Sequence, residues 1–251
     1  MKAFFSFFNK QKRFADGIVN GDIEYSSYYK DSFKRFRKNK AAMTCLAIIL
    51  LLIAVAIFAP LIAPYDPNHQ DYQSVLAQPN AKHLLGADEY GRDILSRIIY
   101  GTRISLSIGI LAQLLASIIG ITLGSLAGYF GGIVDAVISR IMEIFSAFPD
   151  LIFAMAIMTF LGQGILNLYI ALGFLTWVRT ARMIRGAVIQ LKEKEYVEAS
   201  RASGGRSFRI IVKHLIPNCL STIIVLVTLG IPHAIMYEAS LSFLGLGIQP
   251  P

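Results

Sequence analysis

Two glutamates lie in apolar stretches of the sequence, where a charged group is costly. Glu143 falls within the run at 138–161, and Glu238 lies near the end of a run that begins at residue 218. A charge at the centre of a bilayer costs about 2.5–3.5 kcal/mol on insertion scales, so such groups usually face a protein interior or a water-filled cavity. Both glutamates are therefore candidates for lining a polar pathway. Pairing of Glu143 with Arg140, one helical turn earlier, is the alternative.

A second acidic group, formed by Asp88, Glu89 and Asp93, has side chains that could hold a cation. Its spacing is not that of a regular cation-binding loop, and Arg92 and Arg97 are close enough in sequence to neutralise it. We therefore expect ion pairs here, and neither a metal nor a cofactor in this chain.

The sequence lacks the residue sets that nucleophilic catalysis and nucleotide binding require. The sequence has no G-x-x-x-x-G-K-[ST], H-E-x-x-H, C-x-x-C or G-x-S-x-G motif, and the GGRS at 204–207 does not replace one. Both cysteines, Cys45 and Cys219, fall in apolar stretches. The histidines are scattered along the chain at His69, His83, His214 and His233. The sequence therefore does not support an enzyme, and we do not expect the chain to bind ATP.

The composition places these residues in a membrane. The chain is 55% hydrophobic and 16% charged, whereas about a quarter of the residues of a soluble domain are charged. A helix needs about 20 apolar residues to cross a bilayer. Five segments are predicted to do so, at 41–63, 104–127, 138–161, 165–180 and 218–237. The net charge of +8 does not indicate nucleic acid, because the basic residues flank these spans.

Basic residues predict the orientation of the spans. Six of them lie between positions 30 and 40, and nine, against three acidic residues, lie between 179 and 213. The positive-inside rule places both segments in the cytoplasm. Residues 64–103 are then external. Residues 1–40 are predicted to be a cytoplasmic tail, or in part a Phe-containing helix on the membrane surface.

Small residues and helix breakers predict how the spans pack. In the second span a small residue recurs at every fourth position, which makes a flat face for another helix; the residues are Ala112, Ala116, Gly120, Gly124 and Gly128. Pro149 is expected to kink or interrupt the third span, and Asp150 to mark the kink. Pro232 is expected to interrupt the fifth.

A basic stretch from Glu198 to Pro217, EASRASGGRSFRIIVKHLIP, separates the last two spans. A helical run ends at Gly204-Gly205, and a second short run follows before Pro217 opens the next apolar segment. Glycine ends helices readily, and proline is tolerated in a first turn. The pattern predicts two short helices with a sharp break between them.

This stretch resembles the cytoplasmic EAA loop of ABC importer permeases, which has E-A-A, three residues, G, nine residues and I-x-L-P. Three positions depart from the pattern, namely Ser200, His214 and Ile216, but the spacing is intact. LGADEYGRD, AGYFGGIVDAVISRIMEIFSAFP and EASLSFLGLGIQPP are similar to the C-type permease subunit of oligopeptide/dipeptide importers.

The resemblance implies an all-α membrane protein, the polytopic transmembrane domain of a type I ABC importer, in a bacterial inner membrane. It implies a second, B-type permease subunit, two ATPase subunits that carry ATP and Mg, and an extracellular solute-binding protein. A peptide would pass between the two permease subunits. Nickel or another small solute is the alternative cargo, and a non-transporting scaffold or receptor subunit is an alternative of another class.

In that family the loop docks on an ATPase subunit, which implies a set of coupling residues here. The set is Tyr196, Glu198, Ala199, Ser200, Gly204, Arg206, Arg209, His214 and Pro217. The chain would divide into a tail at 1–40, a first span with its external loop at 41–103, and a core at 104–251 that includes the coupling loop at 185–216. Because family members continue into one more span, a sixth is expected to be missing at the C-terminus.

Overall fold

The computed structural model describes residues 33–34 and 36–247, and these are helical except for loops and one isolated bridge between Ala87 and Asp93. The all-α prediction is therefore confirmed. The surface helix or tail predicted near the N-terminus falls mainly on residues 1–32, which lie outside the described residues. The chain forms two units, residues 1–52 and 53–251.

The first apolar segment forms helix α3, Lys40–Ile57, which is long and apolar enough to cross a membrane. A short helix, α4 (Ala59–Ile62), follows, with Pro60 in its first turn. Proline is compatible with that position because the N–H groups of a first turn have no partner within the helix.

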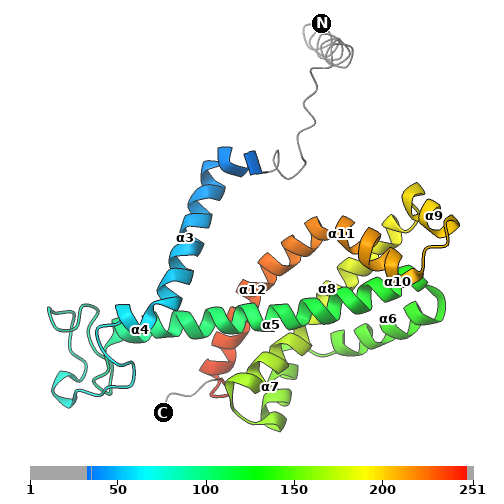
Figure 1. Ribbon diagram of the computed structural model, residues 1–251. Helices are drawn as coiled ribbons and strands as arrows, with labels where there is room; N and C mark the ends of the chain where they lie inside the picture. The colour runs from blue at the N-terminus through cyan, green and yellow to red at the C-terminus, as the bar shows by residue number, and fades with distance from the viewer. Residues whose placement is uncertain (1–32, 35, 248–251) are drawn as a thin grey trace, which may run out of the picture. The chain divides into compact units, whose positions relative to one another are not determined.

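The second unit is organised around α5, Ile94–Phe130, and α8, Ile165–Leu191, which lie side by side (Figure 1). Asp93 caps α5 by accepting a hydrogen bond from the Ser96 backbone N–H at 2.8 Å. The second predicted span, 104–127, is part of this longer helix, which already begins at Ile94. The small-residue face of α5 is buried against α8, so that predicted packing face is confirmed.

The third predicted span is two helices, α6 (Gly132–Ser146) and α7 (Asp150–Leu161), bent by 88°. Pro149 stands at the break in extended backbone and directly precedes α7, so the predicted interruption is confirmed. The turn into α6 uses Gly131 and the first residue of the helix, Gly132, with φ of 65° and 52°. Side chains disfavour these left-handed values.

The expected interruption at Pro232 is wrong. Helix α12, Leu220–Phe243, continues through this proline. Proline leaves one carbonyl without its helical donor, a loss that neighbouring groups in a membrane protein can offset. Between α8 and α12 lie α9 (Glu195–Ala202), α10 (Ser207–Ile210), the π-helical turn η2 (Ile211–Leu215) and α11 (Ile216–Asn218).

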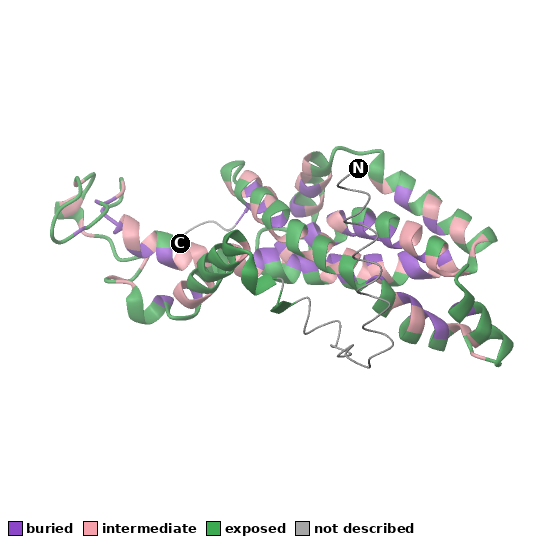
Figure 2. Cartoon of the chain, turned by 90° about the horizontal axis from the view of Figure 1, so that it is seen from above, coloured by how far each residue is buried: buried purple, intermediate pink, exposed green. Residues whose placement is uncertain are grey.

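Among the described residues, length and composition identify three helices that could cross a membrane, α3, α5 and α12, and a fourth crossing if α6 and α7 form one bent span. Helix α8, where another span is predicted, begins apolar but carries Arg179, Arg182 and Arg185 in its second half. Buried residues gather between the helices of the second unit, and exposed ones cover their outer sides (Figure 2).

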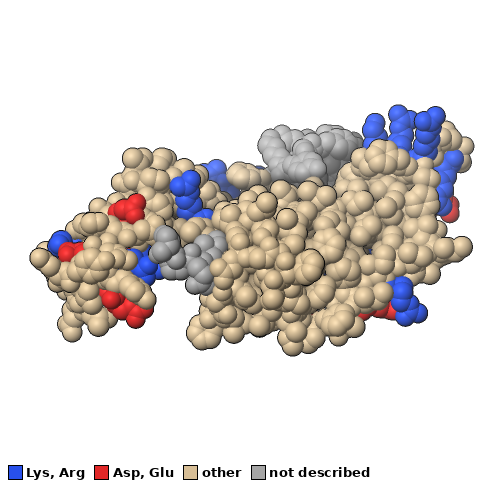
Figure 3. Space-filling model, turned by 90° about the horizontal axis from the view of Figure 1, so that it is seen from below, with Lys and Arg blue, Asp and Glu red and all other residues tan. Residues whose placement is uncertain are grey.

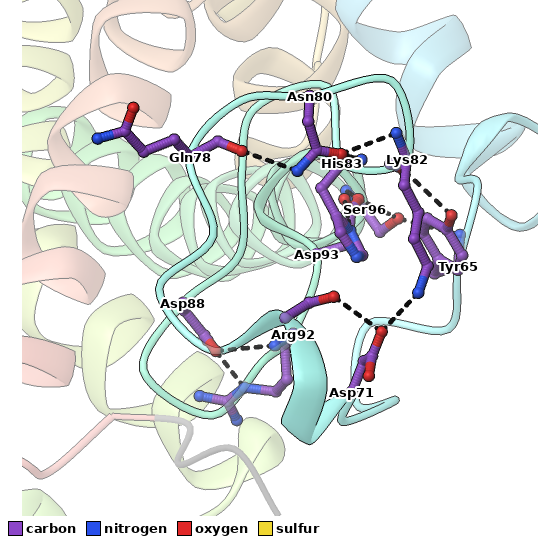
Figure 4. A network of polar contacts seen from close by, with 11 residues as sticks. Tyr65, Asp71, Gln78, Asn80, Lys82, His83, Asp88, Arg92, Asp93 and Ser96 are labelled. Atoms are coloured by element: carbon purple, nitrogen blue, oxygen red, sulfur yellow. Dashed lines mark hydrogen bonds and ion pairs between the residues drawn. The ribbon is translucent and has the colours of Figure 1, made fainter.

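The loop before α5 is held by polar side chains (Figure 4). Asp88 pairs with Arg92 at 2.9 Å and with Arg97 at 3.1 Å, which confirms the predicted ion pairs for Asp88. The carboxylate of Asp93, besides capping α5, lies 2.9 Å from Nδ1 of the buried His83. Lys82 bonds the carboxylate of Asp71 at 2.6 Å, and the 3-10 turn η1 (Tyr72–Ser74) starts there.

These contacts lower the pKa of three loop carboxyls. The Lys82 ammonium, and then Ser74 and the Gln73 N–H, lower the pKa of Asp71 from 3.8 to about 2. Burial acts to raise the pKa of Asp93, but hydrogen bonds from Ser96 and His83 outweigh it and the net pKa is lowered. The pKa of Asp88 is lowered in the same way, because hydrogen bonds led by those from Arg92 outweigh the effect of burial.

The lowered pKa values predict that acid loosens this loop. A carboxyl that is more acidic in the folded than in the unfolded chain stabilises the fold above its ordinary pKa, and this contribution is lost as the pH falls through the folded value. For Asp71 that window runs from 3.8 down to about 2. We expect amide protection factors at 64–93, measured by hydrogen exchange in nanodiscs, to fall across it. In Asp71→Asn the fall should be shallower, and equal slopes in the two proteins would contradict the assignment.

Candidate functional site

The basic segment after α8 forms an elbow, defined here as α9, the turn at 203–206, α10, η2 and α11. The two predicted short helices with a break at Gly204-Gly205 are confirmed. Gly204 has a φ of 77°, a value that side chains rarely adopt. A Cβ at Gly205 would lie 2.6 Å from the carbonyl oxygen of Ser200. The two glycines thus serve different purposes. Gly204 allows the backbone conformation of the turn, and Gly205 allows the close approach of the Ser200 carbonyl.

One side of the elbow is apolar and buried. Val197 of α9 is completely buried, as are Ile210 and Leu215 of the second arm. They pack in one cluster with Ile184 and Val188 of α8. Burying such side chains stabilises the arrangement by about 1.5–3 kcal/mol each. The elbow is therefore fixed to the end of α8 and not free to move alone.

The other side of the elbow is exposed. Most of the predicted coupling residues lie there, while two are half-buried, Ser200 and His214; the exposed ones are Tyr196, Glu198, Ala199, Gly204, Arg206, Arg209 and Pro217. Lys and Arg side chains cluster at the end of the molecule where α9 and α10 lie (Figure 3). No ion pair of Arg206 or Arg209 is formed within the described part of the chain.

Two aromatic contacts hold the elbow in shape. The rings of Tyr196 and His214 lie 6.5 Å apart and bring the two arms together. The guanidinium of Arg201 lies 5.1 Å from the centre of the Tyr129 ring, at the end of α5. A cation over an aromatic ring is attracted by the ring's quadrupole. Sequence patterns gave no indication of this link between α9 and α5.

A cavity of about 520 Å³, lined by both apolar and polar side chains, lies among the helices of the second unit. Its lining comes from α5, the end of α6, the start of α7, α8 and α12. The polar and charged members of the lining are Gln113, Ser146, Asp150, Thr176, Arg179, Thr180, Arg182, His233 and Tyr237. A cavity with convergent polar groups is the usual form of a small-molecule site.

Hydrogen bonds order part of this lining. The Tyr237 hydroxyl donates to a carboxylate oxygen of Asp150 at 2.7 Å, and the Arg182 guanidinium donates to Ser146 Oγ at 3.0 Å. Each bond joins helices that are distant in sequence. The sequence alone associated Asp150 only with a kink, and used Arg179 only as an indicator of orientation. A charge beside an apolar segment was the signal available for both.

The two glutamates that the sequence nominated lie elsewhere. Glu143 is exposed and bonds Arg140 at 2.8 Å, which is the alternative pairing. Glu238 is buried on α12, where it accepts hydrogen bonds from Ser242 at 2.8 Å and from Ser105 of α5 at 3.4 Å. Neither belongs to the cavity lining, and a pathway role for them stays a prediction.

One protein-family model matches the part of the chain that contains the elbow and most of the helical core. Residues 120–251 match the model of the binding-protein-dependent transport system inner membrane component. The chain belongs to this permease family. Residues 27–79 match a second model, the N-terminal transmembrane domain of oligopeptide transport permease C. The resemblance to oligopeptide/dipeptide permeases is thus confirmed.

Curated permeases are similar over most of the chain. A dipeptide transport system permease protein of Bacillus subtilis is 42% identical over 97% of this chain and 75% of its own length. An oligopeptide transport system permease protein of the same organism is 42% identical over 90% and 74%. A glutathione transport system permease protein of Pectobacterium atrosepticum is 40% identical over 89% and 74%. Such permeases are membrane components of transport systems, so the permease is not itself a catalyst.

Proposed function

We propose that this permease is one membrane subunit of an ATP-driven peptide importer, and that an ATPase subunit moves it through the elbow. The named cargoes of the relatives, dipeptides, oligopeptides and glutathione, are all peptides. This favours a peptide over nickel or another small solute. A scaffold without transport would have no need for a polar cavity among its helices.

The observation that carries the coupling role is the two-sided construction of the elbow. Its apolar side is packed on Ile184 and Val188 of α8, and its other side presents Glu198, Ala199 and Arg209 to a partner. Small side chains allow a partner surface to approach closely, and unpaired basic groups suit an acidic one. A force on the exposed side is therefore passed to α8, whose middle lines the cavity.

The remaining parts of the machine would be other chains. ATP and Mg would bind to two ATPase subunits, because this sequence has no P-loop motif. A second permease subunit would complete the passage, and an extracellular solute-binding protein would deliver the peptide. The basic residues of the elbow favour a cytoplasmic position for it, with the N-terminus on the same side of the bacterial inner membrane.

Purification and uptake together test this function. The chain is isolated from native membranes, the copurifying proteins are identified, and the complex is reconstituted in vesicles with radiolabelled dipeptides, oligopeptides and Ni²⁺. We expect an ATPase and a second permease to copurify, and peptide uptake to require ATP. Recovery without an ATPase would support the scaffold, and ATP-dependent uptake of nickel but not peptide would support the other cargo.

A further inference from the structure

The cavity is lined by charged side chains of both signs that form no close ion pair with each other. Asp150 lies at the first residue of α7, and Arg179 and Arg182 lie one turn apart on α8. Among the described residues no ion pair within 4.0 Å joins Asp150 to either arginine. Asp150 instead accepts a bond from a neutral phenol, and Arg182 donates to a neutral hydroxyl.

Such charges need a partner of opposite sign or water. Within a membrane protein, ionisable side chains are costly unless they face a wet cavity or a counter-charge, and they commonly mark the route of a solute. Arg179 is exposed, contributes to the cavity lining and donates no hydrogen bond to any described residue. Its planar guanidinium is well suited to a carboxylate, which it can bind through two parallel hydrogen bonds.

We infer that this cavity contacts the two charged ends of a passing peptide. Asp150 binds the terminal ammonium of the peptide, and Arg179 binds its terminal carboxylate. The inference rests on the proposed peptide import and adds to it a recognition chemistry inside the membrane. The cavity volume of about 520 Å³ lies within the range of roughly 300–1,000 Å³ of small-ligand sites. A lone metal ion fits less well, since the described residues hold no group of three metal-ligating side chains.

Tyr237 is a positioning residue in this arrangement. Its hydroxyl occupies one oxygen of Asp150, which leaves the other oxygen for an ammonium group. Asp150→Asn keeps an acceptor for this hydroxyl and removes only the charge, so it is the variant least disturbing to the fold. Arg179→Gln is the corresponding neutral variant on α8.

The test compares trialanine, N-acetyl-trialanine and trialanine amide in the reconstituted transporter. Uptake by each variant is divided by wild-type uptake of the same peptide, so that preferences of the binding protein cancel. Hydrogen bonds to charged groups contribute about 1.5–3 kcal/mol, which is about tenfold or more. We expect Asp150→Asn to lose about tenfold on the two free-amine peptides but not on the acetylated one. Arg179→Gln should lose as much on the free-acid peptides but not on the amide.

A second readout does not depend on the binding protein. In a Cys45→Ser background, the thiol introduced by Thr176→Cys, at a position that lines the cavity, is modified with a maleimide in nanodiscs. Millimolar trialanine should slow the modification, and Asp150→Asn should abolish that protection. Glu89→Gln and Arg103→Gln, which remove exposed charges outside the cavity, are the matched controls and should change neither assay.

The outcomes separate this inference from the function on which it rests. Two results would overturn the inference that the cavity binds the charged ends of the peptide: equal losses of uptake on all three peptides, or no loss in either variant while the wild type imports peptide. Either result would leave the proposed peptide import unaffected. Absence of ATP-dependent peptide uptake by the wild type would overturn peptide import itself.

Discussion

Replacing Gly204 with proline, or Glu198 with arginine, is expected to abolish substrate-stimulated ATP hydrolysis by the assembled transporter while the permease still inserts into the membrane. Gly204 has a φ of 77°, and its N–H donates to the Arg201 carbonyl at 2.9 Å. Proline fixes φ near −65° and has no N–H, so it cannot adopt this turn. The two arms of the elbow would then point in different directions.

The Glu198 variant acts differently, because it leaves the backbone intact. The side chain of Glu198 is exposed near the start of α9. It lies in sequence between Val197, which is buried, and Ala199, which is exposed. Reversing its charge places a cation among the basic residues of the elbow and removes an acidic group that can bond a polar or basic group of the partner. Stimulated ATPase activity of the reconstituted complex is measured with and without peptide and binding protein.

Matched variants show whether coupling itself has been lost. Gly204→Asn should keep most of the activity, because asparagine tolerates the left-handed region better than other side chains. Glu193→Arg makes the same charge reversal on an exposed residue just before α9 and should cost much less. Unchanged stimulated ATPase activity and uptake in both Gly204→Pro and Glu198→Arg would overturn the assignment of the elbow.

Gly124→Ala is expected to destabilise the permease, although it adds only one methyl group. The new Cβ would clash with the backbone carbonyl oxygen of Ala181 on α8, and a backbone cannot turn aside as a side chain can. Overpacking of a close interface costs about 1–3 kcal/mol. Gly120→Ala should act alike, because its Cβ would lie 2.6 Å from the Cβ of Thr180. Thermal unfolding of the purified protein in detergent measures both.

Gly101→Ala is the control for this prediction. It lies on the same helix, α5, but a Cβ there has no neighbouring atom within 4 Å. Alanine is a better helix former than glycine by about 1 kcal/mol, so this variant should unfold at the same or a higher temperature. Equal stability of Gly124→Ala and Gly101→Ala would show that α5 and α8 do not pack as closely as the structure has them.

The elbow could be predicted from the sequence because its features are local. A glycine pair between two helical runs determines where the backbone turns, whatever surrounds it. The exposed position of Glu198 and Ala199 follows from the polarity of their neighbours. The η2 turn and the contact of Arg201 with Tyr129 could not be predicted in this way, since they depend on how α9 and the second arm rest on α5 and α8.

The cavity shows the opposite case. Tyr237 and Asp150 are 87 positions apart in sequence, and no spacing rule brings a tyrosine of α12 to the start of α7. Charge in an apolar segment pointed instead to Glu143 and Glu238. Glu143 has a partner three residues away, and Glu238 has one four residues away and another on α5.

By itself the sequence determined the helical class, the apolar segments, the small face of α5, the break at Gly204 and the permease family. Each depends on residue type and periodicity along one helix or turn. Only the tertiary structure decided that α6 and α7 bend by 88°, that α12 runs through Pro232, and that Asp150 and Arg179 line one cavity. Such features depend on the angles and registers at which separate helices pack. Many sequence patterns are compatible with more than one packing angle or register.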